Sequence, residues 1–184
     1  ATATRAPTAL ELFGDRAFLR GDTRLRPERA ETFDLGATLR GRAGPVRGQA
    51  ELRGFATFAS DLIRYFRTST FEAVPQNVDS ATLVGGELGV NGSVTRHFHL
   101  TGALTVLETW TPYLGQTRRL PLRPGVTAYV SPSLRLFALG PLDRLELWAD
   151  LLHVGASHWD PANTSALPAR TRVGVGAALS TWGG

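Results

Sequence analysis

The residues of this sequence best suited to binding chemistry are arginines that lie close to aromatic residues. The stretch RYFRTSTF places Arg64 and Arg67 around Tyr65 and ends at Phe71. A guanidinium group can pair with carboxylate or phosphate oxygens through two parallel hydrogen bonds, and an aromatic ring can stack on a flat ligand. These side chains would suit an anionic, partly aromatic ligand. The predicted ligand-binding residues, in this stretch and in a later loop, are Arg64, Tyr65, Arg67, Arg118, Arg119 and Arg123.

Other polar groups do not predict a catalytic or metal site. His97 and His99 point to the same side of an extended segment, but two ligands alone favour plain solvated histidines. The run SHWD ends at Asp160, and its neighbouring residues would point to opposite sides of an extended chain, so they cannot form a triad. The chain has no cysteine and no lysine, which excludes thiolate chemistry and a P-loop. We therefore predict no catalytic residue, no metal and no cofactor.

The positive charge of the chain raises the question of nucleic-acid binding. The net charge is +4, the sequence pI is about 10.5, and all 20 basic residues are arginine. The arginines are scattered singly along the chain instead of clustering on one segment, so we predict no nucleic-acid partner. The absence of lysine has two alternative explanations: a GC-rich genome, or selection for arginine as a planar cation.

The elements that must position the candidate residues are strands. From Thr32 to Arg40, every odd position is apolar and every even position is polar or small, which is the period of a strand with one apolar face. No segment keeps a helical period for long, so the predicted class is all-β. Similar alternation predicts strands in residues 49–63, 82–92, 97–110, 125–136, 144–154 and 170–182.

Strand length and loop length favour a transmembrane β-barrel over a soluble β-sandwich. The strands run to roughly ten to fourteen residues, which suits a tilted strand that crosses a bilayer. Their connections alternate between short turns and loops of about fifteen residues, as in outer-membrane barrels. The mean hydropathy of −0.08 excludes a membrane helix but not alternating membrane strands. The arginines predicted to lie within strands fall in the polar register: Arg40, Arg53, Arg135, Arg144 and Arg172.

Seven such strands do not close a barrel. Bacterial single-chain barrels use an even number of strands, and an open sheet would leave unpaired backbone groups in lipid. The opening ATATRAPT alternates briefly and suits the end of an eighth strand. We therefore expect an antiparallel transmembrane β-barrel segment of about seven strands that is part of a larger barrel, with the missing strands N-terminal to Ala1.

Several motifs resemble those of TonB-dependent outer-membrane receptors, and together they cover most of the chain. RAPTALELFG resembles an R-x-P-T motif followed by ELYG, and RLRPE resembles the segment NPxLKPE. NVDSATLVGGELGV is similar to the strand pattern N-x-x-x-A-x-x-x-G-x-E, and the last strand ends on the aromatic Trp182, after which Gly183 and Gly184 depart from the pattern. The matching residues are Arg5, Pro7, Glu11, Leu12, Gly14, Leu25, Arg26, Pro27, Glu28, Asn77, Ala81, Gly85 or Gly86, and Glu87.

This resemblance implies that residues 1–184 form the C-terminal part of a receptor barrel in the cell outer membrane. The family's function would be uptake of a scarce nutrient such as a ferric siderophore. The resemblance also implies three sets of partners: the remaining barrel strands and an N-terminal plug domain, a periplasmic energy-coupling protein, and outer-membrane lipid with lipopolysaccharide. The charged segment before Thr32 would then be an extracellular loop, with Pro27 setting an extended start to the strand.

Alternatives to ligand uptake remain at this point. Trp110 and Trp182 suit an interfacial aromatic girdle, and the loop arginines suit lipopolysaccharide phosphates instead of a ligand. The chain could also be a structural barrel segment, a scaffold subunit of an envelope complex without transport activity. A third possibility is a soluble β-sandwich binding module.

Overall fold

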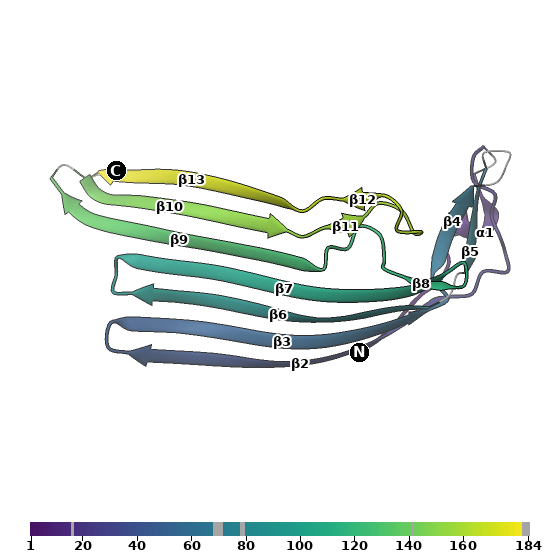
Figure 1. Ribbon diagram of the computed structural model, residues 1–184, viewed down its shortest axis with the longest axis horizontal. Coiled ribbons are helices and arrows are strands. Elements are labelled where there is room, and N and C mark those ends of the chain that lie inside the picture. The colour runs from purple at the N-terminus through teal and green to yellow at the C-terminus, as the bar shows by residue number, and fades with distance from the viewer. Residues whose placement is uncertain (16, 68–71, 78–79, 141, 182–184) are drawn as a thin grey trace.

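A computed structural model shows one large antiparallel sheet, and it describes residues 1–15, 17–67, 72–77, 80–140 and 142–181 (Figure 1). The sheet follows the order β1-β2-β3-β6-β7-β9-β10-β13, and β8 extends β7 at one end. The sheet strands are β1 (Thr2–Arg5), β2 (Glu28–Ala43), β3 (Val46–Ser60), β6 (Ala81–Val94), β7 (Phe98–Tyr113), β8 (Gln116–Arg118), β9 (Val126–Leu139), β10 (Leu142–Val154) and β13 (Arg170–Thr181).

The seven predicted long strands are all present, each 12 to 16 residues long. The brief alternation at the start of the chain is a strand as well, because β1 pairs with β2 from Thr2 opposite Glu31 to Arg5 opposite Glu28. This pairing explains why β2 begins at Glu28, four residues before the predicted start at Thr32. The strands pair only with their sequence neighbours in the sheet, as in an up-and-down barrel wall.

The two ends of the sheet differ in how the strands are connected. At the short-turn end, β2 joins β3 through Gly44 and Pro45, and Gly44 has a φ of 56°, which suits the first central position of a hairpin turn. At the long-loop end, the connections carry small elements of their own, and one isolated helix precedes β2. These elements are α1 (Ala9–Phe13), β4 (Ile63–Arg67) paired with β5 (Ala73–Asn77), and β11 (Ser157–His158) paired with β12 (Ala166–Leu167).

Register gives the sheet an apolar face and a polar face. Leu52 lies opposite Ala37 and Leu88 on the apolar face, whereas Arg53 lies opposite Gly36 and Glu87 on the polar face. The apolar face is open in this chain: Leu35 and Val175 are 82% and 83% exposed. A face this apolar and this exposed is the face that a lipid bilayer would cover.

Glycines on the polar face make room for large side chains of neighbouring strands. A Cβ atom on Gly85 would stand 2.6 Å from the ring of Phe55, and one on Gly176 would overlap the ring of Trp148. Because glycine has no side chain, the backbone of the adjacent strand is uncovered at these positions. The rings of Phe55 and Trp148 lie over it. Of the two glycines that match the receptor motif, Gly85 is the one with this role.

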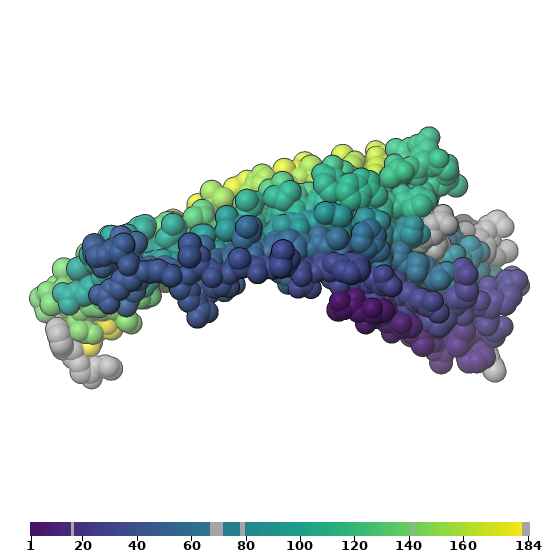
Figure 2. Space-filling model, turned by 90° about the horizontal axis from the view of Figure 1, so that it is seen from below, coloured from purple at the N-terminus to yellow at the C-terminus, as the bar shows by residue number. Residues whose placement is uncertain are grey.

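Most of the buried residues gather at the long-loop end, where loops fold against the sheet. They include Ala59, Ile63, Pro75, Ala81, Thr109 and Thr111. Figure 2 shows the arched sheet from below, with the N-terminal segment tucked against that end. No helix in the described part of the chain is long and apolar enough to cross a membrane.

Candidate ligand-binding site

Four charged or polar residues from four separate segments form a cluster at the long-loop end. We call Arg5, Glu11, Glu28 and Tyr65 the rim clasp. Arg5 in β1 donates to Glu11 in α1 through Nη1 and Nη2 at 3.1 and 3.2 Å, and to Glu28 in β2 through Nε at 2.5 Å. Tyr65 in β4 donates to Glu11 Oε1 at 3.2 Å, and Glu28 Oε1 accepts from the backbone of Ile63 at 2.7 Å. The clasp therefore ties the helix and the β4–β5 hairpin to the edge of the sheet.

Glu11 has a second role as part of a helix capping box. The hydroxyl of Thr8 accepts from the backbone of Glu11 at 3.2 Å, and the Glu11 carboxylate accepts from the backbone of Thr8 at 2.7 Å. Glu11 is only 4% exposed, yet hydrogen bonds from the Arg5 guanidinium and from Thr8 lower its pKa to about 2. The carboxylate stays charged at neutral pH despite its burial.

The helix was missed in the sequence because it has only five residues, too few for a hydrophobic period to show. The pattern T-x-x-E from Thr8 to Glu11 is the signal that could have found it. Arg5, Glu11 and Glu28 were recognised as motif residues, but their spacing did not show that they meet. The ligand-binding role of Tyr65 stays a prediction, and in the structure its hydroxyl donates to Glu11 in the clasp.

A second contact fixes the loop before β2. The side chain of Asn77 accepts from the backbone of Arg26 at 2.7 Å and donates back to the Arg26 carbonyl at 2.9 Å. It also donates to the carbonyl of Asp61 at 2.6 Å, and the Arg26 guanidinium pairs with the Asp61 carboxylate at 2.5 Å. Asn77 thus joins two loops that are far apart in sequence.

A hollow of about 370 Å³ opens on the polar face at the long-loop end, and it brings Arg64 and Arg123 together. Three long connections contribute to it: the first supplies Leu62 and Arg64, the second Leu120, Pro121 and Arg123, and the third Pro161. Its floor is made by the sheet residues Ala59, Ala81 and Leu83.

The hollow is held in shape by buried threonines of β7. Thr109 Oγ1 accepts from the backbone of Leu120 at 3.0 Å, which holds the second loop against the sheet. Arg64 Nη2 donates to Thr111 Oγ1 at 3.4 Å, and Thr111 in turn donates to the carbonyl of Ser80. Arg64 is half-buried and Arg123 is exposed. Two cations above an apolar floor can hold an anionic ligand that also has an apolar or flat part.

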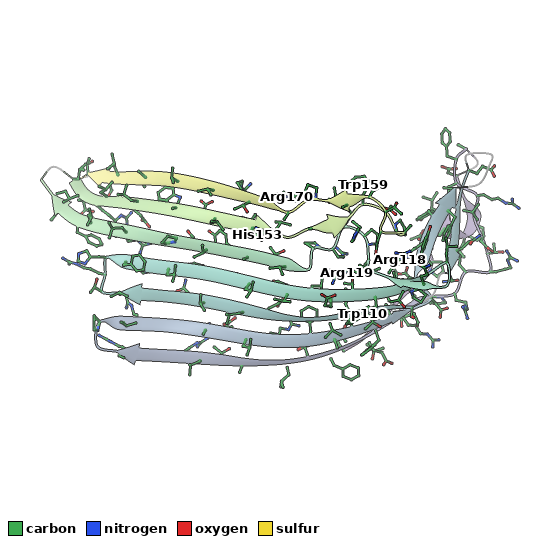
Figure 3. All side chains as sticks on the ribbon, in the orientation of Figure 1. Trp110, Arg118, Arg119, His153, Trp159 and Arg170 are labelled. Carbon is green, nitrogen blue, oxygen red and sulfur yellow. The ribbon has the colours of Figure 1, made fainter. Side chains whose placement is uncertain are left out.

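Two other predicted arginines, Arg118 and Arg119, lie elsewhere. Arg119 pairs with Glu108 at 2.8 Å on the apolar face, next to Trp110, and its backbone is held by the side chain of Asn163. Arg118 donates to Gln116 within the β7–β8 hairpin. Figure 3 shows Arg118, Arg119 and Trp110 together at the long-loop end. The side chain of Arg67 and the residues Phe71 and Trp182 lie outside the described part of the chain.

The histidines and the SHWD run have other partners. His99 Nε2 lies 3.1 Å from Arg135 Nη1, and the His97 ring packs against Phe137. Asp160 accepts hydrogen bonds from the backbone of Thr164 and Ser165 in its own loop, and these bonds lower its pKa to about 2. Among the described residues, no group of three or more histidine, cysteine, aspartate and glutamate side chains is placed to hold a metal.

A curved antiparallel sheet with one lipid-type face and one polar face, short turns at one end and folded loops at the other, is the wall of a membrane β-barrel. Residues 1–182 match the model of the TonB dependent receptor-like β-barrel family, and the chain belongs to that family. In outer-membrane barrels the polar face lines the lumen and the long loops lie on the extracellular side, so these two parts are called the lumen face and the extracellular end below. Proteins of this family are transporters rather than enzymes, in agreement with the prediction that the chain is not an enzyme.

Several solved structures share this fold. The copper transporter OprC shares 18% identity and a TM-score of 0.68 over 97% of this chain and 27% of its own. The ferric yersiniabactin uptake receptor FyuA from Yersinia pestis shares 17% identity and a TM-score of 0.64 over 83% of this chain and 22% of its own. The siderophore receptor PiuA from Acinetobacter baumannii shares 21% identity and a TM-score of 0.60, with 82% and 22% covered.

The chain therefore spans about a quarter of the length of these structures. At such low identities, the likeness concerns the fold alone. No curated protein sequence matches the chain. The family and the fold leave no support for a soluble β-sandwich.

Proposed function

We propose that this chain forms part of the barrel wall of an outer-membrane receptor that takes up a scarce nutrient as an anionic chelate, such as a ferric siderophore. The observation that carries the proposal is the hollow at the extracellular end, where Arg64 and Arg123 meet from two different loops. The names of two similar structures, a ferric yersiniabactin uptake receptor and a siderophore receptor, support an iron chelate as the ligand.

The partners of the proposed receptor follow from the family. The strands that complete the barrel would pair with the edges at β1 and β13, a plug domain would fill the lumen, and a periplasmic energy-coupling protein would drive transport. On the outside, the Glu108–Arg119 pair and Trp110 lie at the extracellular end of the apolar face, where they suit contact with outer-membrane lipid and lipopolysaccharide head groups.

The proposal separates the predicted arginines by what they contact. Arg64 and Arg123 form no ion pair among the described residues and line the hollow, so their charge is available to a ligand. Arg119 is paired on the outer surface, and Tyr65 belongs to the rim clasp. We therefore assign ligand contact first to Arg64 and Arg123.

The test uses the complete membrane protein in cells that lack other iron receptors. We would measure uptake and equilibrium binding of a panel of radiolabelled ferric siderophores by the protein with Arg64→Ala and Arg123→Ala combined. A hydrogen bond to a charged group contributes about 1.5–3 kcal/mol, so the double variant should bind at least about tenfold more weakly. Arg24→Ala is the matched control, because Arg24 is exposed in a loop at the same end and pairs with Asp22 of its own loop.

Two results would contradict the proposal. Unchanged affinity in the double variant would show that the hollow does not hold the ligand. Absence of uptake of any siderophore by the unaltered receptor, with the protein folded in the membrane, would favour a scaffold role instead.

A further inference from the structure

The lumen face at the short-turn end carries a group of arginines without carboxylate partners among the described residues. Arg40 and Arg42 come from β2, Arg47 from β3, and Arg96 from the turn between β6 and β7. Higher on the same face, Arg53 lies between Asp34 at 3.5 Å and Glu87 at 4.0 Å. Arg40, Arg42, Arg47 and Arg96 thus lie together at the short-turn end of the lumen wall.

Two of these arginines face each other directly. Arg42 lies opposite Arg47 in the register of β2 and β3, on the lumen face. Side chains directly opposite one another in an antiparallel pair have Cβ atoms about 5 Å apart, and like charges at that spacing are destabilising. An anion between the two guanidinium groups would remove this repulsion.

A hollow of about 530 Å³ lies beside this pair on the same face. Its polar lining includes Arg40, Arg47, Gln49, Asn91, Ser93 and His99. Glycines alternate with these side chains along the strands, so the backbone of Gly41, Gly48 and Gly92 also lines the hollow.

The donors of this hollow are held in place. Arg47 Nε donates to Ser93 Oγ at 3.0 Å, which fixes the guanidinium beside the hollow, and Asn91 donates to Thr101 at 3.1 Å. The nearest carboxylate along β3 is Glu51, which accepts a hydrogen bond from the Gln49 amide and does not pair with Arg40 or Arg47 in the structure. Cationic donors held in this way can bind an oxyanion.

We infer that this hollow, the lower cradle formed by Arg40, Arg47 and His99, binds a carboxylate or phosphate group inside the lumen. The inference does not rest on the proposed siderophore site, which lies at the opposite end of the sheet. The oxyanion has two possible sources with the same chemistry: a solute that passes through the barrel, or an acidic side chain of a protein segment that occupies the lumen.

The test measures the electrostatic potential at the cradle with charged thiol reagents. In the complete membrane protein, Asn91→Cys places a thiol at an exposed position of the hollow, in a chain that has no other cysteine. We would compare the modification rates with an anionic sulfonate reagent and a cationic ammonium reagent of equal reactivity. The same comparison would be made with Arg40→Gln and Arg47→Gln added, and with Arg172→Gln as a control on the same face at the other end.

A free anion site predicts that the sulfonate reagent reacts at least about tenfold faster than the ammonium reagent, since a cationic cleft concentrates anions. Inorganic phosphate should slow this reaction relative to chloride at equal ionic strength. The preference should disappear in the double arginine variant and persist in Arg172→Gln. A reactive thiol with no charge preference and no protection by phosphate would overturn the inference.

An unreactive thiol also decides the question. If the thiol of the Asn91→Cys variant reacts only after Arg40 and Arg47 are replaced by glutamine, a carboxylate of the protein itself covers the cradle, which supports the inference. If the thiol stays unreactive in both backgrounds, the inference is wrong. Heat-dependent migration on gels would confirm that each variant is folded. Arg40→Gln alone serves as a milder variant, because it leaves the hydrogen bond from Arg47 to Ser93 intact.

Discussion

The two ends of the sheet use arginine in different ways. At the extracellular end, Arg5 joins Glu11 and Glu28, Arg26 joins Asp61, and Arg119 joins Glu108. At the short-turn end, Arg42 faces Arg47 and neither has a carboxylate partner among the described residues. Long loops need polar contacts to hold them, whereas a two-residue turn is fixed by its own backbone. Arginines in ion pairs therefore hold the loops at the extracellular end, where Arg64 and Arg123 are left for a ligand, whereas Arg42 and Arg47 at the short-turn end face each other without a carboxylate.

The largest expected effect in this comparison comes from breaking the rim clasp. Glu11→Ala removes the partner of Tyr65 and of the Thr8 backbone, and one of the two partners of Arg5. Because charged hydrogen bonds contribute about 1.5–3 kcal/mol, we expect the extracellular loops to lose up to about 3 kcal/mol of local stability. Limited proteolysis of the loop between β4 and β5 would show this as faster cleavage. Glu51→Ala on the lumen wall is the control, and equal cleavage in both variants would contradict the role of the clasp.

The same carboxylate predicts how the extracellular end responds to acid. The pKa of Glu11 is lowered to about 2 from an ordinary value near 4.5. A lowered pKa means that the stabilisation is fully present above about pH 4.5 and is lost as the pH falls towards 2. Proteolysis with an acid-active protease should therefore show loop opening between these values in the native protein, and a smaller step in Glu11→Gln, where Glu28, whose pKa is also lowered by Arg5, is the remaining acid-sensitive carboxylate of the clasp. Opening already at pH 6 would contradict the clasp as the acid-sensitive contact.

A smaller effect is expected from Asn77→Ala. The substitution removes three hydrogen bonds, to both backbone groups of Arg26 and to the Asp61 carbonyl, while the Arg26–Asp61 ion pair remains. Neutral hydrogen bonds contribute about 0.5–1.5 kcal/mol each, and part of this loss is recovered through water, so we expect about 1–2 kcal/mol. Amide hydrogen exchange of the loop before β2 would measure it. Unchanged protection at Arg26 would show that Asn77 does not hold that loop.

The smallest effect should have the opposite sign and lies at the short-turn end. Arg42→Gln removes one of two opposed cations, so without added phosphate it should stabilise the β2–β3 hairpin by about 0.2–1 kcal/mol. Hydrogen exchange of the hairpin, with Arg172→Gln as a control, would detect the change. Destabilisation of the hairpin under these conditions would mean that an anion already bridges Arg42 and Arg47.

The strands were predictable from the sequence and the rim was not. The alternation from Thr32 to Arg40 arises within a single strand, because one of its faces has apolar surroundings and the other has polar surroundings. The sequence alone therefore shows it. The clasp joins Arg5 to Glu28 across 23 residues and Glu11 to Tyr65 across 54, and no local pattern marks such contacts. For the same reason, the sequence did not show which of the six predicted ligand-binding residues come together, and among the described side chains the hollow brings together Arg64 and Arg123.

A ligand-bound structure of the complete membrane protein would test the account most directly, with the ferric siderophore that its cells take up fastest. We expect the chelate in the hollow at the extracellular end, with anionic oxygens within hydrogen-bonding distance of the Arg64 and Arg123 guanidinium groups. The clasp residues Arg5, Glu11 and Tyr65 should keep the contacts seen here. A chelate bound elsewhere, with the hollow empty, would contradict the division between structural and binding arginines.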